Sequence, residues 1–182
     1  MYQYVKNQFS LQYKATIGAD FLTKLLQKDD KQIQLQLWDT AGAEKYNSMG
    51  SSFYRNSEAC ILVFDLTNQE SFKNIETWRN EFLNVLNPPD ADVYPFILVG
   101  NKSDMKEEIS VKNEDIEAYC KAHNNMPYYP ASAKEDINLE EAFNKIGDLA
   151  YLRNSKNEES FVPTNKFLKI TQEEPKKTRK CC

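Results

Sequence analysis

Polar and apolar side chains alternate from residue 32 to residue 37, and Trp38 ends the segment. In an extended strand, this pattern places one set of side chains on each face. The set on the apolar face is Ile33, Leu35 and Leu37. The segment 21–27 is mostly apolar, and the polar run 28–31 separates it from the alternating segment. Two such runs joined by a short polar turn predict a β-hairpin.

From residue 59 onward, short apolar runs alternate with segments of helical periodicity. The run 59–66 is almost wholly apolar, as in a strand buried on both faces. Ser71 is placed to cap the helix that follows, and Pro88-Pro89 ends it. The pattern predicts strands at 59–66, 94–100 and 127–130, and helices at 71–86, 113–123 and 138–153. This alternation is typical of an α/β fold with a mostly parallel sheet flanked by helices.

The apolar pattern weakens from about residue 154, and the chain ends in the polar sequence EEPKKTRKCC. We therefore expect a folded domain over residues 1–153 and a flexible tail over residues 154–182. The length of 182 residues suits one domain of ordinary size, and 41% hydrophobic residues are enough for a core.

Composition and charge exclude several classes of protein. A net charge of −4 gives no electrostatic footprint for nucleic acid. The longest apolar run, 59–64, is too short to span a bilayer, and the first ten residues lack the apolar core of a signal peptide. The cysteines show neither a disulfide framework nor a zinc spacing, and they are Cys60, Cys120, Cys181 and Cys182. We expect a reduced, cytosolic protein whose last two residues have a special role.

Polar clusters follow three of the predicted strands. They are WDTAG (38–42), NKSD (101–104) and ASAK (131–134). In open α/β sheets, ligands bind beyond the carboxyl ends of the strands. Each cluster alone is more typical of a plain turn, but the three in this order indicate a ligand site.

These clusters resemble the motifs of small GTPases of the Ras superfamily. NKSD is similar to the N-K-x-D guanine motif, and SAK (132–134) is similar to the loop that meets the guanine carbonyl oxygen. The resemblance implies that Asp104 accepts hydrogen bonds from the edge of guanine and that the stem of Lys102 lies over the base. The guanine side that it implies comprises Asn101, Lys102, Asp104, Ser132, Ala133 and Lys134.

Two further segments resemble the switch regions of this superfamily. They are YKATIGADF (13–21) and DTAG (39–42). The resemblance implies that Thr16 and Asp39 hold Mg²⁺, and that Tyr13 and the Gly42 N–H face the nucleotide. GTP or GDP and Mg²⁺ are the cofactors that it implies. Ordering of these loops by the γ-phosphate would make the protein a switch.

Within the superfamily, the chain resembles the Rab family, and it looks closest to the late-endosomal and vacuolar branch. IGADF (17–21), the tryptophan of WDTAG and the terminal Cys-Cys carry this resemblance. Phe21, Trp38 and Phe53 fall on the aromatic positions that Rab effectors contact. The alternative for these aromatic residues is plain hairpin and core packing.

The end of the chain fits the same family. The resemblance implies geranylgeranyl groups on Cys181 and Cys182, and the alternative is an unmodified polar tail. Two lipid chains, or one chain with a basic patch, give durable membrane attachment. The basic residues just before the cysteines add to this attraction, and they are Lys176, Lys177, Arg179 and Lys180.

The resemblance also implies partners and a location. The partners are effectors, exchange factors, activating proteins, the escort protein, the GDP-dissociation inhibitor and a membrane reached through the prenylated tail. The location is the cytoplasmic face of endosomal, lysosomal or vacuolar membranes, in exchange with the cytosol. We expect a monomer that does not bind nucleic acid.

The chain departs from the family pattern at the phosphate loop. None of its five glycines begins the Gly-Lys-[ST] end of that loop. Residues 1–10 look like the end of the family's first helix, so we expect the fold to lack the first strand and the phosphate loop. Because that strand lies inside the family's sheet, its two neighbours would lose a ladder partner. Two explanations stay open: an incomplete version of a full GTPase, or a short form that has given up tight nucleotide binding.

A second departure is Ala43, which follows DTAG. The family usually has a glutamine there, and its amide orients the attacking water. We therefore assign no catalytic residue and expect slow intrinsic hydrolysis, although activating proteins of this family supply a glutamine and an arginine of their own. The functions that we weigh are a nucleotide-dependent switch in vesicle traffic and a nucleotide-free interaction module that docks effectors or the prenylation machinery.

Overall fold

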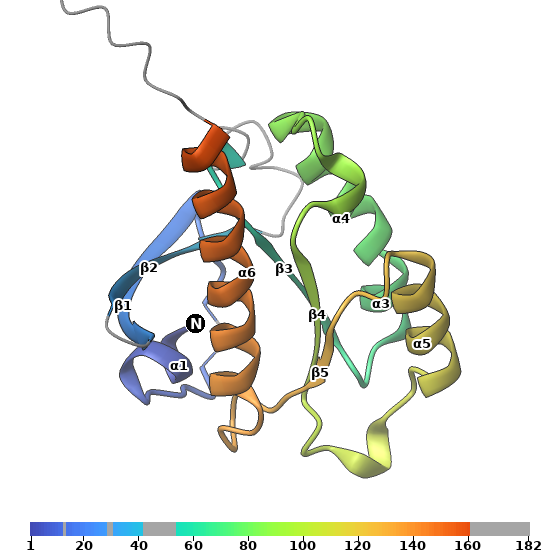
Figure 1. The fold of residues 1–182 in the computed structure, drawn as a ribbon. Coiled ribbons are helices and arrows are strands. Elements are labelled where there is room, and N and C mark those ends of the chain that lie inside the picture. The colour runs from blue at the N-terminus through green and yellow to red at the C-terminus, as the bar shows by residue number, and fades with distance from the viewer. Residues whose placement is uncertain (13, 29–30, 42–53, 161–182) are drawn as a thin grey trace, which may run out of the picture.

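The computed structural model describes residues 1–12, 14–28, 31–41 and 54–160 (Figure 1). Helices and strands follow in this order: α1 (Tyr2–Lys6), β1 (Ala19–Lys28), β2 (Lys31–Thr40), β3 (Cys60–Asp65), α3 (Gln69–Lys73), α4 (Ile75–Leu86), β4 (Phe96–Asn101), α5 (Asn113–Ala122), β5 (Tyr128–Pro130) and α6 (Leu139–Ser160). Two short 3₁₀ helices, η2 (Ala91–Val93) and η3 (Lys106–Glu108), flank β4. No helix of the described residues is long and apolar enough to cross a membrane.

The predicted hairpin is confirmed, and its strands are longer than predicted. β1 and β2 pair antiparallel, with Phe21 opposite Trp38 and Leu26 opposite Ile33. The alternating pattern has the expected effect, because Leu37 is buried while the glutamines of β2 are exposed. The hairpin therefore turns one apolar face toward the rest of the protein.

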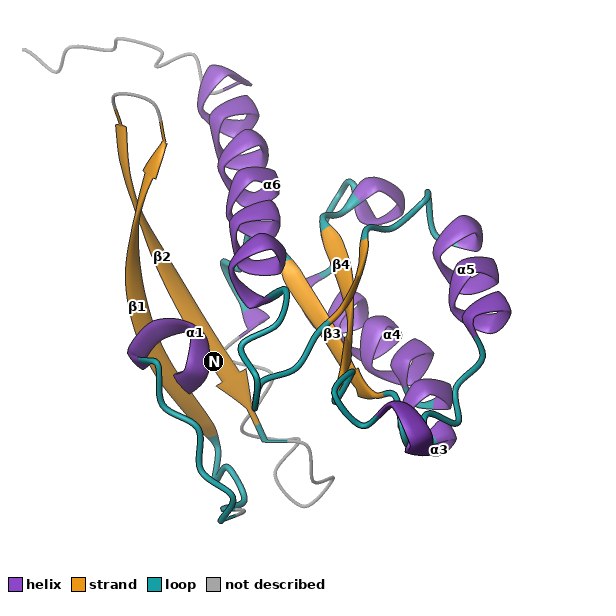
Figure 2. Cartoon of the chain, turned by 90° about the horizontal axis from the view of Figure 1, so that it is seen from below, coloured by secondary structure: helices purple, strands orange, loops and turns teal. Residues whose placement is uncertain are grey.

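The predicted α/β core is confirmed as a parallel sheet in the order β3-β4-β5. Figure 2 shows α6 on one side of this sheet and α3, α4 and α5 on the other. Side chains of β4 alternate between two cores: Phe96 and Leu98 pack with α4 and α5, and Ile97 and Val99 pack with α6. Because both of its faces are covered, β4 is almost wholly apolar.

The hairpin and the parallel sheet are two separate sheets. Within the described ranges, the one strand paired with β2 is β1, and the one strand paired with β3 is β4. This division agrees with the expectation that the family's first strand is missing between its two neighbours. The α6 core joins the sheets instead, since Leu37 of β2 and Ile97 of β4 belong to the same buried cluster.

The prediction that β3 is buried on both faces is wrong at one position. Val63 is 56% exposed, whereas its register partner Val99 on β4 is 7% exposed. Because β3 is an edge strand of the described sheet, its side chains on the α6 side have a covered neighbour on one side only. A run of apolar residues could not reveal which strand would lie at this edge.

The helix predicted at 71–86 is two helices, α3 and α4, which meet at Asn74. The predicted cap is also wrong, because the side chain of Asn68 accepts hydrogen bonds from the N–H groups of Glu70 and Ser71. Ser71 instead uses its hydroxyl to accept from the Asp65 N–H at 3.0 Å. This bond ties the first turn of α3 to the end of β3.

The last helix runs past its predicted end at Arg153 and reaches Ser160. Arg153 anchors it with two hydrogen bonds to Asp90, of 3.0 Å from Nε and 2.6 Å from Nη2. Nearer its start, the ring of Phe143 stacks on Tyr4 of α1, with the ring centroids 4.1 Å apart. Helix α6 therefore holds α1 and the hairpin against the parallel sheet.

Candidate functional site

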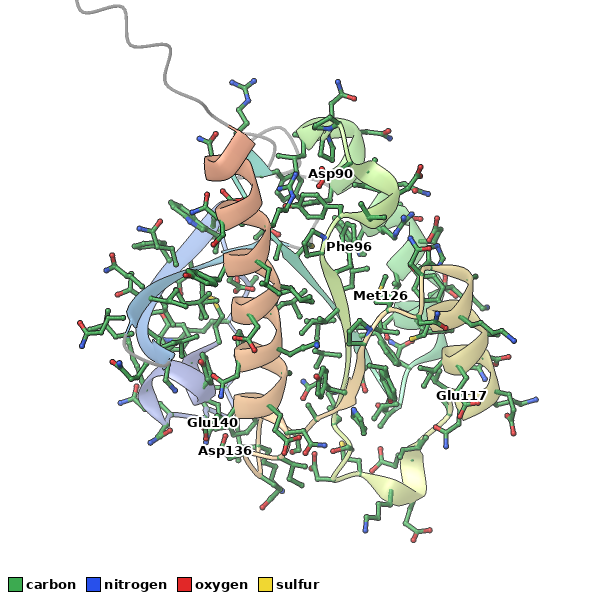
Figure 3. The ribbon with its side chains drawn as sticks, in the orientation of Figure 1. Asp90, Phe96, Glu117, Met126, Asp136 and Glu140 are labelled. Atoms are coloured by element: carbon green, nitrogen blue, oxygen red, sulfur yellow. The ribbon has the colours of Figure 1, made fainter. Side chains whose placement is uncertain are left out.

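The polar residues of NKSD and SAK meet beyond the carboxyl ends of β4 and β5. In Figure 3, Phe96 marks the amino end of β4, and Asp136 and Glu140 lie near the opposite end of the molecule, close to the start of α6. The chain after β5 follows the chain after β4, because the Ala131 N–H donates to Gly100 O at 2.8 Å and the Ser103 N–H donates to Ala131 O at 3.0 Å. The sheet thus places two loops side by side that are distant in sequence.

Side chains then fasten these two loops to each other. The Ala133 N–H donates to Oδ1 of Asn101 at 3.1 Å, and the Ser132 hydroxyl donates to Oδ1 of Asp104 at 2.6 Å. Ser132 is fully buried, and its oxygen also accepts from the Glu135 N–H at 3.0 Å. The structure therefore brings Asn101, Asp104, Ser132 and Ala133 together, as the sequence predicts.

The Asp104 carboxylate is held in its ionised form. The hydrogen bond from Ser132 lowers its pKa, partial burial opposes this effect, and the nearby cations of Lys134 and Lys102 add to it. An ionised carboxylate is an acceptor only, so it suits a ligand edge that presents two N–H donors. Guanine has such an edge, and adenine does not present donors in that arrangement.

The two lysines of the site make ion pairs with carboxylates. Lys134 Nζ lies 3.0 Å from Oε1 of Glu135, which raises the pKa of Lys134. Lys102 Nζ lies 2.7 Å from Oδ2 of Asp65, the last residue of β3. No motif of the sequence points to Asp65. The one feature that could have indicated a role for Asp65 is its position at the end of β3, beside Asn101 at the end of β4.

The switch-side residues form a second, smaller cluster. The Thr16 hydroxyl donates to Oδ2 of Asp39 at 3.1 Å, and both groups lie at the surface end of β2. The Ala41 N–H donates to Gly18 O at 2.9 Å, where Gly18 has φ +74°. That backbone conformation favours glycine, so the turn depends on this residue.

A hydroxyl and a carboxylate are the oxygen ligands that Mg²⁺ prefers. Thr16 and Asp39 are close enough to contact one ion, so they fit a partial magnesium site. The described residues hold no group of three or more His, Cys, Asp or Glu side chains arranged for a metal. Further ligands would therefore be water and nucleotide oxygens, as Mg²⁺ generally retains several such ligands.

Two of the three predicted effector aromatics lie together on the hairpin. Phe21 and Trp38 are cross-strand partners, with ring centroids 4.6 Å apart. They are 41% and 47% exposed, so hairpin packing does not account for their full surface. Tyr13, Gly42, Ala43, Phe53, Cys181 and Cys182 lie outside the described residues.

Sequence comparisons with known proteins identify the family to which these motifs belong. The Ras family sequence model matches residues 1–151. The GTP-binding protein YPTC5 of Chlamydomonas reinhardtii is 46% identical over 184 residues, which cover 100% of this chain and 88% of the relative. The Ras-related protein Rab-7b of Paramecium octaurelia is 42% identical over 185 residues, with 100% of this chain and 88% of the relative covered. The Ypt/Rab-type GTPase ypt7 of Schizosaccharomyces pombe is 49% identical over 151 residues, with 82% and 74% covered.

The chain therefore belongs to the Ras family, and within it to the Rab small GTPases of the late-endosomal and vacuolar branch. The family has the mixed α/β architecture seen here, and its members bind guanine nucleotides. The resemblance drawn from NKSD, SAK and the switch motifs is thereby confirmed at the level of the family.

Proposed function

We propose that this protein is a Rab-type switch in traffic from endosomes to the lysosome or vacuole, and that it binds GTP or GDP together with Mg²⁺. The observation that carries the proposal is the joining of Asn101 to Ala133 and of Asp104 to Ser132 at the ends of two strands. These bonds aim an ionised carboxylate at the place where the edge of guanine would lie. The names of the relatives, a GTP-binding protein and Rab-type GTPases, support this function over a nucleotide-free interaction module.

The base contact is the part of this function that the chain's own residues support best. Asp104 accepts from the two N–H donors of guanine, Asn101 and the Ala133 backbone complete the loop, and the stem of Lys102 covers the base. Ser132 holds the second loop in place, and Lys134 adds a cation near Asp104. Thr16 and Asp39 would hold Mg²⁺, whose chemistry is to neutralise phosphate charge. Tyr13 and the Gly42 N–H would face the nucleotide.

The experiment is a titration of the folded 182-residue chain with fluorescent GDP and fluorescent xanthosine diphosphate, in the presence of Mg²⁺. Wild type should prefer GDP. Asp104→Asn should reverse the preference, because an amide donates to the C2 carbonyl of xanthine where a carboxylate repels it. Lys134→Met is the matched control, and it should retain the GDP preference. Absence of saturable binding in a folded sample would contradict the proposal.

We infer that hydrolysis by the chain alone is slow. Phosphoryl transfer depends on positioning of the attacking water and on stabilisation of charge in the transition state. The methyl group of Ala43 can neither orient the water nor stabilise that charge. In a chain that also carries the family's phosphate loop, Ala43→Gln should raise the rate of single-turnover hydrolysis, and a Rab-directed activating protein should raise that rate even with Ala43 in place. Equal rates with Ala43 and with Ala43→Gln in that longer chain, with and without the activating protein, would contradict this inference.

The remaining elements of the proposal concern partners and the membrane. Effectors would contact the exposed face of Phe21 and Trp38, with Phe53 as the third aromatic residue. The part of residues 154–182 that follows α6 would act as the tail, prenylated on Cys181 and Cys182, and would be recognised by the escort protein and the GDP-dissociation inhibitor. The protein would cycle as a monomer between the cytosol and the cytoplasmic face of endosomal and vacuolar membranes. Replacing both cysteines with serine should release it from membranes in a fractionation assay.

A further inference from the structure

Lys102 is held in an unusual way for a surface lysine. Its backbone has φ +66°, in the left-handed region, and its Nζ lies 2.7 Å from Oδ2 of Asp65. Its side chain is 48% exposed, yet this ion pair gives its end a fixed position. A lysine without such a partner would sample many rotamers. Asp65 is the one residue of the described chain with which Lys102 forms an ion pair.

Hydrogen bonds hold both the carboxylate and the backbone N–H of Asp65. Its Oδ1 accepts from the Thr67 N–H at 2.9 Å and from the Thr67 hydroxyl at 2.7 Å, which leaves Oδ2 for Lys102. Its own N–H donates to Oγ of Ser71 at 3.0 Å. The next backbone N–H, of Leu66, donates to Asn101 O at 3.0 Å. The backbone that carries the carboxylate is therefore bonded to β4 and to α3.

The charges around the pair agree with this arrangement. Burial disfavours the ionised form of Asp65, but hydrogen bonds from Lys102 and Thr67 outweigh it, and the pKa of Asp65 lies below its ordinary value. The carboxylate is thus charged at neutral pH. Its distance from Lys102 is that of a charge-assisted hydrogen bond.

We propose that Asp65 is a positioning residue of the guanine site: it holds the Lys102 ammonium at the end of β3 so that the lysine stem stays in place beside the base. This inference rests on the proposed binding of guanine nucleotide. Asp65 acts on the nucleotide site through Lys102. Because an alkyl stem covers any purine, Asp65 contributes to affinity and not to the choice of base, which remains with Asp104.

The competing view is that Asp65 only closes the turn after β3 through Thr67. Three variants separate these roles. Asp65→Asn keeps an oxygen for Thr67 but loses the charge that Lys102 needs. Thr67→Val removes the hydroxyl bond to Asp65 and keeps the ion pair between Asp65 and Lys102. Lys102→Met keeps most of the stem and removes the ammonium.

The test measures affinity for fluorescent GDP and fluorescent xanthosine diphosphate in the 182-residue chain with Mg²⁺. Asp65→Asn should weaken GDP binding about fivefold, the upper range for a partly exposed ion pair. The ratio of GDP to xanthosine diphosphate affinity should stay unchanged. In the Lys102→Met background, Asp65→Asn should cause no further loss, and Thr67→Val should leave affinity close to wild type. The inference would be overturned if Asp65→Asn weakened GDP binding equally in the wild-type and Lys102→Met backgrounds. It would also be overturned if Thr67→Val weakened GDP binding as much as Asp65→Asn does.

A second measurement needs no nucleotide. Asp65→Asn should lower the urea midpoint of unfolding in the native background and should leave it unchanged in the Lys102→Met background, because the cycle isolates the pair. If the folded wild type binds neither nucleotide, the proposed function fails, and this cycle still decides whether Asp65 holds Lys102. Equal midpoint shifts in both backgrounds would show that Asp65 does not hold Lys102.

Discussion

The guanine side and the switch side each contain a hydroxyl–carboxylate hydrogen bond, and the two bonds lie in different surroundings. On the guanine side, Ser132 donates to Asp104 at 2.6 Å, and Ser132 is fully buried. On the switch side, Thr16 donates to Asp39 at 3.1 Å, and Asp39 is exposed. The first bond joins loops that the parallel sheet already holds together. The second joins a surface loop to the end of a hairpin.

This difference shows which part of the site folding itself completes. Buried polar groups need their partners because an unmade hydrogen bond is costly there, whereas exposed groups can exchange a partner for water. The guanine side should therefore be formed before any ligand arrives. The switch side should change its contacts when a ligand competes for Thr16 or Asp39, which is the behaviour that a switch requires.

The largest expected effect comes from breaking the core that joins both regions. Ile97 is fully buried between β4 and α6, in the cluster that also holds Leu37 of the hairpin. Ile97→Ala should lower the free energy of unfolding by about 2–5 kcal/mol, through lost burial and the cavity left behind. Urea unfolding measures this loss, and Val63→Ala is the exposed control on the same sheet, expected within about 0.5 kcal/mol of wild type. Similar losses for the two variants would contradict the assigned burial.

The next largest effect is expected at the hydroxyl group of Ser132, which is buried, in contrast to that of Thr16. Ser132→Ala should lower the free energy of unfolding by about 1–3 kcal/mol, because it leaves both Asp104 and the Glu135 N–H without their buried partner. Thermal or urea unfolding measures it. A loss below the error of the method would show that water replaces the hydroxyl and that the guanine side is as open as the switch side.

A dependence on pH sharpens the same comparison. The pKa of Asp104 is lowered in the folded protein, mainly by Ser132. Its stabilising contribution is therefore complete above the unfolded value of about 3.9 and is lost as pH falls through the lower folded value. The stability gap between wild type and Ser132→Ala should be constant from pH 7 to about 5 and should narrow below about 4. A gap that stays constant through this acid range would contradict the role of Ser132.

The smallest effect is expected at the switch side. Thr16→Val should change the free energy of unfolding by less than about 0.5 kcal/mol, because both partners are open to water. The same variant should weaken the Mg²⁺ dependence of GTP binding, which a titration with Mg²⁺ would measure. A loss of stability as large as that of Ser132→Ala would remove the distinction between the two regions.

Sequence patterns predicted the guanine side well because its motifs are short and contiguous. Asn101 ends β4, Asp104 follows it, and Ser132 follows β5, and both strands are revealed by their own apolar runs. The contact between Asp65 and Lys102 was missed because it depends on the pairing of β3 with β4, which no single run reveals. The exposure of Val63 was missed for the same reason, since burial of a strand depends on its neighbours.

Helix boundaries show a second limit of sequence patterns. The apolar stripe from Phe72 onward predicted one helix, and its residues are indeed buried in the core or packed against it. The break at Asn74 and the cap at Asn68 come from local hydrogen bonds that the stripe does not contain. Ser71 looked like a cap because of its residue type, but it serves the end of β3 instead.

The most direct test of a preformed guanine side is amide hydrogen exchange in the nucleotide-free protein, followed by NMR. The Ala133 and Glu135 N–H groups donate to Asn101 and Ser132, whereas the Ala41 N–H donates to Gly18 in the switch region. We predict that Ala133 and Glu135 exchange at least about tenfold more slowly than Ala41 in the nucleotide-free protein. Exchange of Ala133 and Glu135 at the rate of Ala41 or faster would contradict the claim that folding alone completes the guanine side.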